Sequence, residues 1–407
     1  MRSPQFKITV SRCALAMIAL AMAFANPAFA DKKLKIFILA GQSNMQGHAN
    51  AHTMATLFNS DDPRDKQLIE LVFKKDRKIS KKIFDEQVAR GRVIDELTGG
   101  ISRKKIKETT DPTAKAALEA KVKPLLEAHE AYKAGVVESA VVSNRVYISA
   151  ISGGKTRGKL GPGYGANTKK IGPEYAFGLS MAQKIDGPIL LIKSAWGGKS
   201  INHNFRPPSV GPYVLSEKEK AGKNADKLRE NAGLNWRMMN EHVHKVLADL
   251  KSHHPAYDAS AGHEIAGFVW FQGFNDQFSE EYRNNYKTNM IAFIKDVRKE
   301  YKAPNMPFVI GVIGTAIVKE KVDANAVAQG QRAAAKAPEF KGNVVAVESY
   351  TEHDLKVYEV YKSGWAPNYH VWDTHGSDRP YHYLGSGTFF VRLGDSFATA
   401  MAKMMAK

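Results

Sequence analysis

Polar residues that could hydrolyse an ester follow three of the apolar runs in this 407-residue sequence. The first cluster is Gly41-Gln42-Ser43-Asn44, the second is Trp196-Gly197-Gly198-Lys199-Ser200, and the third is Gln272-Gly273-Phe274-Asn275-Asp276. A fourth cluster, residues 377–387, lies just before the last helical pattern. Each cluster alone is typical of a tight turn. Together they offer a nucleophile, a base and several hydrogen-bond donors.

Ser43 is the candidate nucleophile, because a serine hydroxyl attacks an ester once an imidazole accepts its proton. His382 can be that base, and Asp378, on the same loop, can orient the imidazole. The oxyanion that forms needs preorganised donors. The backbone N–H groups of Ser43 and Gly198, with the side-chain amide of Gln272, can supply them.

Other residues compete for these roles. Asp373 is the second candidate for the orienting acid, and a Ser–His dyad without an acid is a third arrangement. His375 is the rival base, since Asp373 lies beside it in the sequence. The remaining histidines near the clusters show no H-E-x-x-H or comparable spacing, so we expect surface or pocket-wall positions and no metal site for His48, His52 and His203.

Short apolar runs alternate with helical patterns along the chain, which predicts an α/β fold with a parallel sheet covered by helices. The expected strands are residues 35–40, 145–150, 189–193, 265–271, 308–313 and 344–347. The expected helices are residues 175–185, 224–251, 280–301, 325–336 and 389–405. Ligands of such sheets bind beyond the carboxyl ends of the strands, where Ser43 is expected to lie.

One segment departs from this alternation. Residues 60–135 are dense in charged residues, with apolar residues at helical spacing, and Gly99-Gly100 divides them. We interpret this segment as a charged helical insertion in a single domain of residues 31–407. A functional cap and a solvated outgrowth without function are both consistent with the pattern.

The first 30 residues predict export. Basic residues precede an apolar stretch, and Ala28-Phe29-Ala30 forms a small-x-small pattern, as in a secretory signal peptide. Its removal takes away the only cysteine, Cys13, which excludes disulfides from the mature chain. No later run approaches the length of a membrane span, so we expect a soluble periplasmic or extracellular protein.

The net charge biases the partner toward anionic material. It falls from +18 to about +15 once the basic residues of the signal are removed. No nucleic-acid motif of known spacing is present, so nucleic acid is not an expected partner. The sequence does not indicate an oligomeric state.

Several blocks resemble the carbohydrate-esterase branch of the SGNH hydrolases, which includes sialate O-acetylesterase-like and acetylxylan-esterase-like proteins. They are GQSNMQG, GPEYAFG, SAWGGKSI, WFQGFND and YHYLGSG, in that order. The resemblance implies a three-layer flavodoxin-like fold and hydrolysis of acetyl esters on sugars without metal or cofactor. It gives Ser43 the role of nucleophile, His382 that of base, and Gly198 and Gln272 those of oxyanion donors.

The sequence departs from the family pattern at two places. Phe274 stands where the family commonly has glutamate, and the G-x-N-D spacing makes Asn275 an alternative oxyanion donor to Gln272. Asp378 lies four residues before His382, whereas the family acid usually lies three before its histidine.

Residues near these blocks could bind the sugar. Trp196, Phe274 and Tyr381 could pack against a sugar ring, although large aromatic side chains are more often core residues. Arg206 could contact an acidic sugar or pair with a carboxylate.

Two other functions compete with a secreted carbohydrate O-acetylesterase. An α/β-hydrolase needs a G-x-S-x-G elbow, and Met45 occupies the position of its last glycine. A catalytically impaired sugar-binding protein is the stronger alternative. The changes at Phe274 and Asp378 favour it, whereas the retained Ser43 and His382 favour the enzyme.

Overall fold

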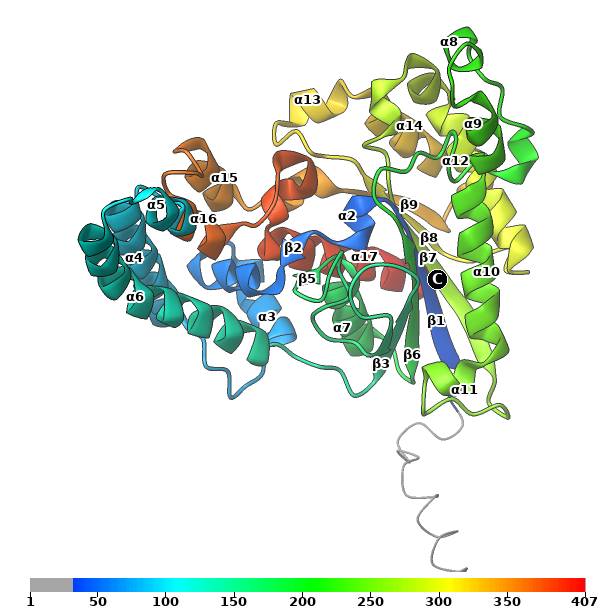
Figure 1. The fold of residues 1–407 in the computed structure, drawn as a ribbon. Helices are drawn as coiled ribbons and strands as arrows, with labels where there is room; N and C mark the ends of the chain where they lie inside the picture. Colours follow the sequence, from blue (N-terminus) through cyan, green and yellow to red (C-terminus); the bar gives the residue numbers. More distant parts are fainter. Residues whose placement is uncertain (1–31, 407) are drawn as a thin grey trace, which may run out of the picture.

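The protein, described by a computed structural model over residues 32–406, is built on a seven-stranded sheet (Figure 1). The strand order is β4-β3-β6-β1-β7-β8-β9, and every pairing is parallel except that of β4 with β3. The strands are β1 (Leu34–Gly41), β3 (Val146–Ala150), β4 (Arg157–Lys159), β6 (Ile189–Ala195), β7 (His263–Phe271), β8 (Phe308–Val312) and β9 (Val344–Glu348). A separate pair joins β2 (Ala49–Asn50) to β5 (Lys170–Ile171).

Helices cover both faces of the sheet and give the molecule three layers. Phe37 and Leu39 of β1 face one core, with α7 (Glu174–Lys184) and α17 (Gly387–Met405). Ile36 and Ile38 face the other core, which includes α10 (Leu234–Ala248), α12 (Glu280–Glu300) and α14 (Ala326–Ala335). Strands buried on both faces explain the nearly continuous apolar runs of the sequence. The predicted α/β fold, a mostly parallel sheet covered by helices, is confirmed.

The predicted strands each agree with an observed strand to within two residues. The helix predicted over residues 224–251 is wrong as a single element. It is divided into α9 (Ala225–Asn231), α10 and α11 (Leu250–His253). Gly233, with a left-handed φ of 67°, separates α9 from α10, and the non-helical Asp249, with φ of −141°, separates α10 from α11. The short strand β4 was not predicted, since its three residues are largely exposed and carry no apolar signal.

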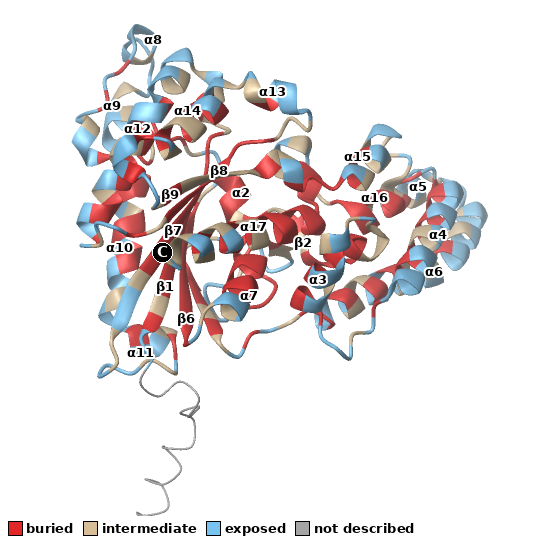
Figure 2. Ribbon diagram, turned by 180° about the vertical axis from the view of Figure 1, so that it is seen from behind, coloured by how far each residue is buried: buried red, intermediate tan, exposed pale blue. Residues whose placement is uncertain are grey.

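Charged helices between β1 and β3 extend to one side of the sheet (Figures 1 and 2). They are α3 (Pro63–Val72), α4 (Lys81–Thr98), α5 (Ser102–Glu108) and α6 (Pro112–Glu138). We refer to α4, α5 and α6 as the helical arm. The arm lies against α16 (Tyr369–His375), which α15 (Leu355–Lys362) precedes in the chain. The predicted helical insertion is therefore present. That it belongs to a single domain of residues 31–407 stays a prediction.

Short elements complete the loops around the sheet. They are α2 (Ser43–Gln46), η2 (Ala51–Asn59), η3 (Pro208–Val210), α8 (Glu217–Lys220), η4 (Asp276–Phe278), α13 (Lys319–Asp323), η5 (Pro338–Phe340), η6 (Ser349–Glu352) and η7 (Pro380–Gly385). Across residues 32–406, the helices are all too short or too polar to span a bilayer. The predicted signal peptide lies outside the described residues.

The carboxyl ends of three neighbouring strands bring the first three polar clusters together. Gly41, the last residue of β1, is in register with Ala195 of β6 on one side and Phe271 of β7 on the other. A Cβ at Gly41 would lie 2.1 Å from the Phe271 carbonyl oxygen, so only glycine fits this approach. The loops that begin after these strands therefore start side by side.

Candidate active site

Ser43 is the first residue of α2, directly beyond the end of β1. Its side chain is nearly buried, with 7% of the residue exposed. Backbone N–H groups in the first turn of a helix have no acceptor within the helix, so the Ser43 N–H is available to a ligand. A Cβ placed on Gly197 would lie 4.0 Å from Ser43 Cβ, which puts the loop after β6 beside the serine.

The side chain of Gln42 fixes the loop that follows β7. Its Oε1 accepts hydrogen bonds from Gln272 Nε2 and Gly273 N, both at 3.2 Å, and from Asn275 N at 3.4 Å. Its Nε2 donates to Asn275 Oδ1 at 3.4 Å. The Gln42 amide therefore orients the Asn275 amide. Because Asn275 Oδ1 faces Gln42, the Asn275 Nδ2 group points away from it.

The Asn275 amide faces the loop that follows β6. A Cβ placed on Gly198, whose φ is 69°, would lie 4.0 Å from Asn275 Nδ2. No hydrogen-bond acceptor for Asn275 Nδ2 is found among residues 32–406. Gly198 thus lies close to Asn275, and its neighbour Gly197 lies close to Ser43, a proximity that is compatible with shared donation to an oxyanion.

Gln272 is engaged within the protein. Its Nε2 donates to Lys199 O at 2.8 Å and to Asp276 Oδ2, besides Gln42, and its Oε1 accepts from Tyr286 Oη at 3.1 Å. An amide nitrogen has only two hydrogens, and here three internal acceptors compete for them. These contacts favour Asn275, the alternative donor, over Gln272.

Asp276 joins the loop after β7 to the loop after β6. Its carboxylate accepts hydrogen bonds from Ile201 N at 3.3 Å and Asn202 N at 3.2 Å, and the residue is fully buried. Burial raises the pKa of Asp276 to about 7. The hydrogen bonds to its carboxylate favour the charged form and lower the pKa, but the effect of burial is larger. The carboxyl therefore links the loops after β6 and β7 beneath the candidate oxyanion site.

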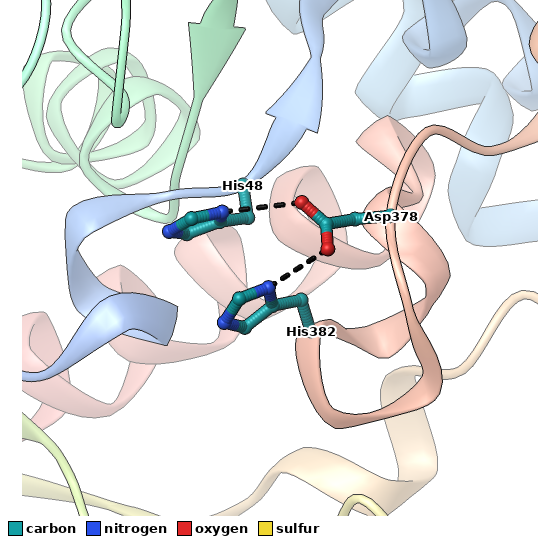
Figure 3. Close-up of side chains that lie close together, drawn as sticks. All are labelled: His48, Asp378 and His382. Carbon is teal, nitrogen blue, oxygen red and sulfur yellow. Dashed lines mark hydrogen bonds and ion pairs between the residues drawn. The ribbon is translucent and has the colours of Figure 1, made fainter. Parts of the chain in front are cut away.

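His382 and Asp378 are in direct contact. Asp378 Oδ1 lies 2.9 Å from His382 Nδ1 and also accepts a hydrogen bond from Arg379 N at 2.8 Å (Figure 3). The turn between the two residues is closed by a hydrogen bond from His382 N to Arg379 O at 2.9 Å, at the start of η7. With Nδ1–H donated to the carboxylate, Nε2 is left as the acceptor that a general base needs.

Two further residues bind Asp378: His48, which was expected only at the surface or on the pocket wall, and Lys170, which the sequence did not single out. Asp378 Oδ2 lies 3.2 Å from His48 Nδ1 and 2.7 Å from Lys170 Nζ. The His48 ring stacks on the His382 ring with centroids 3.9 Å apart (Figure 3). Lys170 lies on β5, and the pairing of β5 with β2 positions it beside Asp378. The only feature of the sequence that indicated a role for His48 was its position five residues after Ser43. No feature of the sequence indicated a role for Lys170.

These contacts set the charge of the site. Burial alone would raise the pKa of Asp378, but hydrogen bonds from His382, His48 and Lys170 hold it well below its usual value. Burial lowers the pKa of His48, which keeps that ring neutral near pH 7. Asp378 is therefore an anion that can stabilise an imidazolium at His382.

Ser43 and His382 lie on loops that are tied together. Asn44 Nδ2 donates a hydrogen bond to Tyr381 O at 3.1 Å, which joins the residue after Ser43 to the residue before His382. Among the described residues, no hydrogen bond joins Ser43 Oγ to the His382 ring. The structure thus brings Asp378 and His382 into contact and places Ser43 on the adjoining loop.

The alternative residues are engaged elsewhere. Asp373 Oδ2 binds His129 Nε2 at 3.0 Å and Lys133 Nζ at 2.9 Å on the helical arm. His375 is buried, and its Nδ1 lies 2.8 Å from Val371 O. His52 Nε2 lies 2.6 Å from the Asp373 carbonyl oxygen. His203, also buried, binds Leu228 O.

The predicted sugar-binding residues divide into two groups. Phe274 and Tyr381 have ring centroids 5.9 Å apart, and Tyr381, 44% exposed, lies edge-on to His382 at 4.5 Å. Trp196 is partly buried and packs near Phe205, at 5.9 Å. The Arg206 guanidinium donates to four backbone carbonyl oxygens within residues 202–212, which indicates a loop brace rather than a ligand contact.

The His48, Asp378 and His382 side chains are also spaced as metal ligands, with candidate ligand atoms within 4.8 Å of one another. The Lys170 ammonium, 2.7 Å from Asp378 Oδ2, supplies a positive charge at the same carboxylate. Repulsion from this ammonium opposes a dication there.

The fold and this geometry define a three-layer α/β protein with serine, histidine and aspartate beyond one edge of its sheet. The family described as "carbohydrate esterase, sialic acid-specific acetylesterase" matches residues 156–357. The resemblance predicted from the sequence motifs is thereby confirmed, and the match supports a carbohydrate esterase. Gly198, Gln272 and Asn275 lie inside the matched segment, whereas Ser43, Asp378 and His382 lie outside it.

Three solved structures are similar to the chain at low identity. A protein from Arabidopsis thaliana has 16% identity and a TM-score of 0.38, over 78% of this chain and 86% of that protein. NanS has 12% identity and a TM-score of 0.38, over 78% of each chain. A carbohydrate acetylesterase from Xanthomonas citri has 13% identity and a TM-score of 0.36, over 79% of this chain and about half (51%) of its own length. Among curated protein sequences, none matches.

Proposed function

We propose that the protein is an exported serine esterase that removes O-acetyl groups from carbohydrate. The observation that carries the proposal is the Asp378–His382 pair, 2.9 Å apart, on a loop tied to the one that bears Ser43. The family match over residues 156–357 supports carbohydrate as the substrate class.

In the proposed reaction, Ser43 Oγ attacks the acetyl carbonyl carbon while His382 Nε2 accepts the hydroxyl proton. Asp378 stabilises the imidazolium through Nδ1–H. The oxyanion accepts hydrogen bonds from the Ser43 and Gly198 N–H groups and from Asn275 Nδ2. Collapse transfers the His382 proton to the sugar oxygen and leaves acetyl-Ser43. Water, deprotonated by His382, then releases acetate and restores the serine.

Release of acetate from acetylated xylan, O-acetylated sialic acid and 4-nitrophenyl acetate tests the proposal. We expect wild-type protein to release acetate and Ser43→Ala to lose about 10³-fold or more of that activity. Equal rates for the two proteins would contradict it. A wild-type protein that hydrolyses none of the three esters but binds their sugars would instead be the sugar-binding protein.

Export is the second part of the proposal, and it rests on the basic, apolar and small-x-small pattern of the first 30 residues. Amino-terminal sequencing of protein recovered from outside the cytoplasm tests it. We expect the mature chain to begin at Asp31. Recovery of the uncut chain from the cytoplasm alone would contradict export.

A further inference from the structure

A cavity of about 290 Å³ lies on the side of Asp378 that faces α15 and α16. Asp378 lines it, whereas neither Ser43 nor His382 does. Asp378 is therefore common to this cavity and to the contact with the His382 ring, to which it is hydrogen-bonded. The volume is near the lower end of small-molecule sites, which begin at roughly 300 Å³.

Aromatic side chains form much of the cavity wall. They come from α15, α16 and the turn between these helices, and are Tyr361, Trp365, Tyr369 and Trp372. Trp372 is nearly buried, and its ring centroid lies 5.5 Å from that of Tyr361. Trp372 is thus largely covered, and Arg379 lies over one face of the Trp365 ring. A pyranose in the cavity would meet the remaining aromatic surface together with the tyrosine hydroxyl groups.

The polar groups of the cavity include one cation without a carboxylate partner. The Arg379 guanidinium lies 4.8 Å from the centroid of the Trp365 ring, and no carboxylate within residues 32–406 forms an ion pair with it. Asn50 also lines the cavity, and its side-chain amide has no hydrogen-bond partner in the part of the chain described. Both groups are therefore available to a ligand.

The two carboxylates in the wall are already neutralised. Asp373 pairs with Lys133 Nζ at 2.9 Å and His129 Nε2 at 3.0 Å. Asp378 pairs with Lys170 Nζ at 2.7 Å. The guanidinium of Arg379 is thus the uncompensated charge at the cavity, and a planar guanidinium binds carboxylate and sulfate groups through paired hydrogen bonds.

We propose that this cavity binds an anionic pyranose residue of the carbohydrate. Arg379 contacts its carboxylate or sulfate group, Asn50 its hydroxyl groups, and the aromatic wall its ring. The inference rests on the proposed esterase function for its ligand class. It goes further by placing a second sugar-binding position beside Asp378, lined by Asn50 and by residues between 361 and 379, all outside the family match, which ends at residue 357.

Isothermal titration calorimetry tests the cavity with three probes: tetragalacturonate, a sulfated carrageenan tetrasaccharide and neutral cellotetraose. We expect at least one anionic probe to bind at least tenfold more tightly than cellotetraose, and the tighter of the two identifies the anionic group. Arg379→Gln should weaken that binding about tenfold or more, because a charged hydrogen bond is lost. Arg92→Gln, at an exposed arginine of α4 outside the cavity, is the matched control and should bind as wild type does.

A second pair of variants tests the aromatic wall. Trp365→Phe should retain most of the affinity, and Trp365→Leu should lose it, while circular dichroism confirms that both fold. Equal affinity of Arg379→Gln and Arg92→Gln, equal binding of neutral and anionic probes, or no binding by wild type would overturn the inference.

Ester hydrolysis measured on the same preparations separates the two proposals. Hydrolysis that depends on Ser43, without binding of an anionic probe, overturns the cavity alone. Binding lost in Arg379→Gln, without hydrolysis that depends on Ser43, overturns the esterase and supports the cavity.

Discussion

The carboxyl edge of the sheet and the helical arm share one kind of contact and differ in another. At the edge, neutral amides of Gln42, Gln272 and Asn275 bind one another directly above the apolar core. At the arm, carboxylates bind across helices: Asp95 of α4 accepts hydrogen bonds from His370 N and Val371 N, at 2.9 and 3.1 Å. Asp276 plays the corresponding part at the edge, where it accepts hydrogen bonds from Ile201 N and Asn202 N. The edge therefore differs from the arm by its additional network of amides, which orients the groups of the candidate site.

Asp378 and Asp373 provide the sharpest test of this difference, because both are acids that bind histidine. Asp378→Asn should lower kcat by about 10³–10⁴-fold, because His382 would lose the carboxylate that selects its tautomer. Asp373→Asn should leave kcat within a few-fold of wild type and lower the free energy of unfolding by about 1–3 kcal/mol. Steady-state kinetics and urea unfolding of both variants measure these effects. Similar kcat losses in the two would show that the arm and the edge are not separable.

Asn275 and Gln272 make the same comparison within one loop. Asn275→Ala should lower kcat about 10²–10³-fold with little change in stability, because it removes one oxyanion donor. Gln272→Ala should destabilise the fold by about 2 kcal/mol or more, because it leaves buried partners such as Lys199 O unpaired. Kinetics at saturating substrate and thermal unfolding distinguish the two. If Gln272→Ala folds normally and loses more kcat than Asn275→Ala does, Gln272 rather than Asn275 is the oxyanion donor.

Much of this organisation could be predicted from the sequence, for physical reasons. Strands buried on both faces leave continuous apolar runs, and the residues after β1, β6 and β7 are polar and glycine-rich. The pairing of Asp378 with His382 was also predicted, because both lie on one loop. The left-handed conformations of Tyr383 and Leu384, directly after His382, were not predicted, because no residue pattern indicates them.

Contacts between distant segments could not be predicted. Lys170 reaches Asp378 across 208 residues, and His370 reaches Asp95 across 275. The choice between Gln272 and Asn275 depends on which amide already has internal partners, a property of packing rather than of sequence. The break at Gly233 shows a similar limit, since the helical pattern continues on both sides of it.

The attachment of the arm should respond to a single substitution. Asp95→Ala should lower the free energy of unfolding by about 1–3 kcal/mol, because it leaves the His370 and Val371 N–H groups without their acceptor. Hydrogen exchange should become faster in α4 and α16 and stay unchanged in β1 and β7. Exchange that rises equally throughout the sheet would contradict a separately attached arm.

Asp276 should make the free energy of unfolding depend on pH. Its pKa is about 7 in the folded protein and near 4 when unfolded, so the folded state holds the proton between these values. Its contribution to the free energy of unfolding is therefore present below about pH 4 and is lost as the pH rises toward 7. The stability of wild type relative to Asp276→Asn should fall over this interval, as measured by urea unfolding at several pH values. A constant difference would contradict the raised pKa.

Covalent labelling of Ser43 tests the central claim most directly. A fluorophosphonate loses fluoride when an activated serine attacks its phosphorus, so mass spectrometry of the digested protein locates the adduct. We predict a single adduct, on the peptide that contains Ser43. It should be absent in Ser43→Ala and should form about 10²-fold or more slowly in His382→Ala. Labelling at another residue, or an equal rate in His382→Ala, would contradict the assignment of Ser43 as nucleophile and His382 as its base.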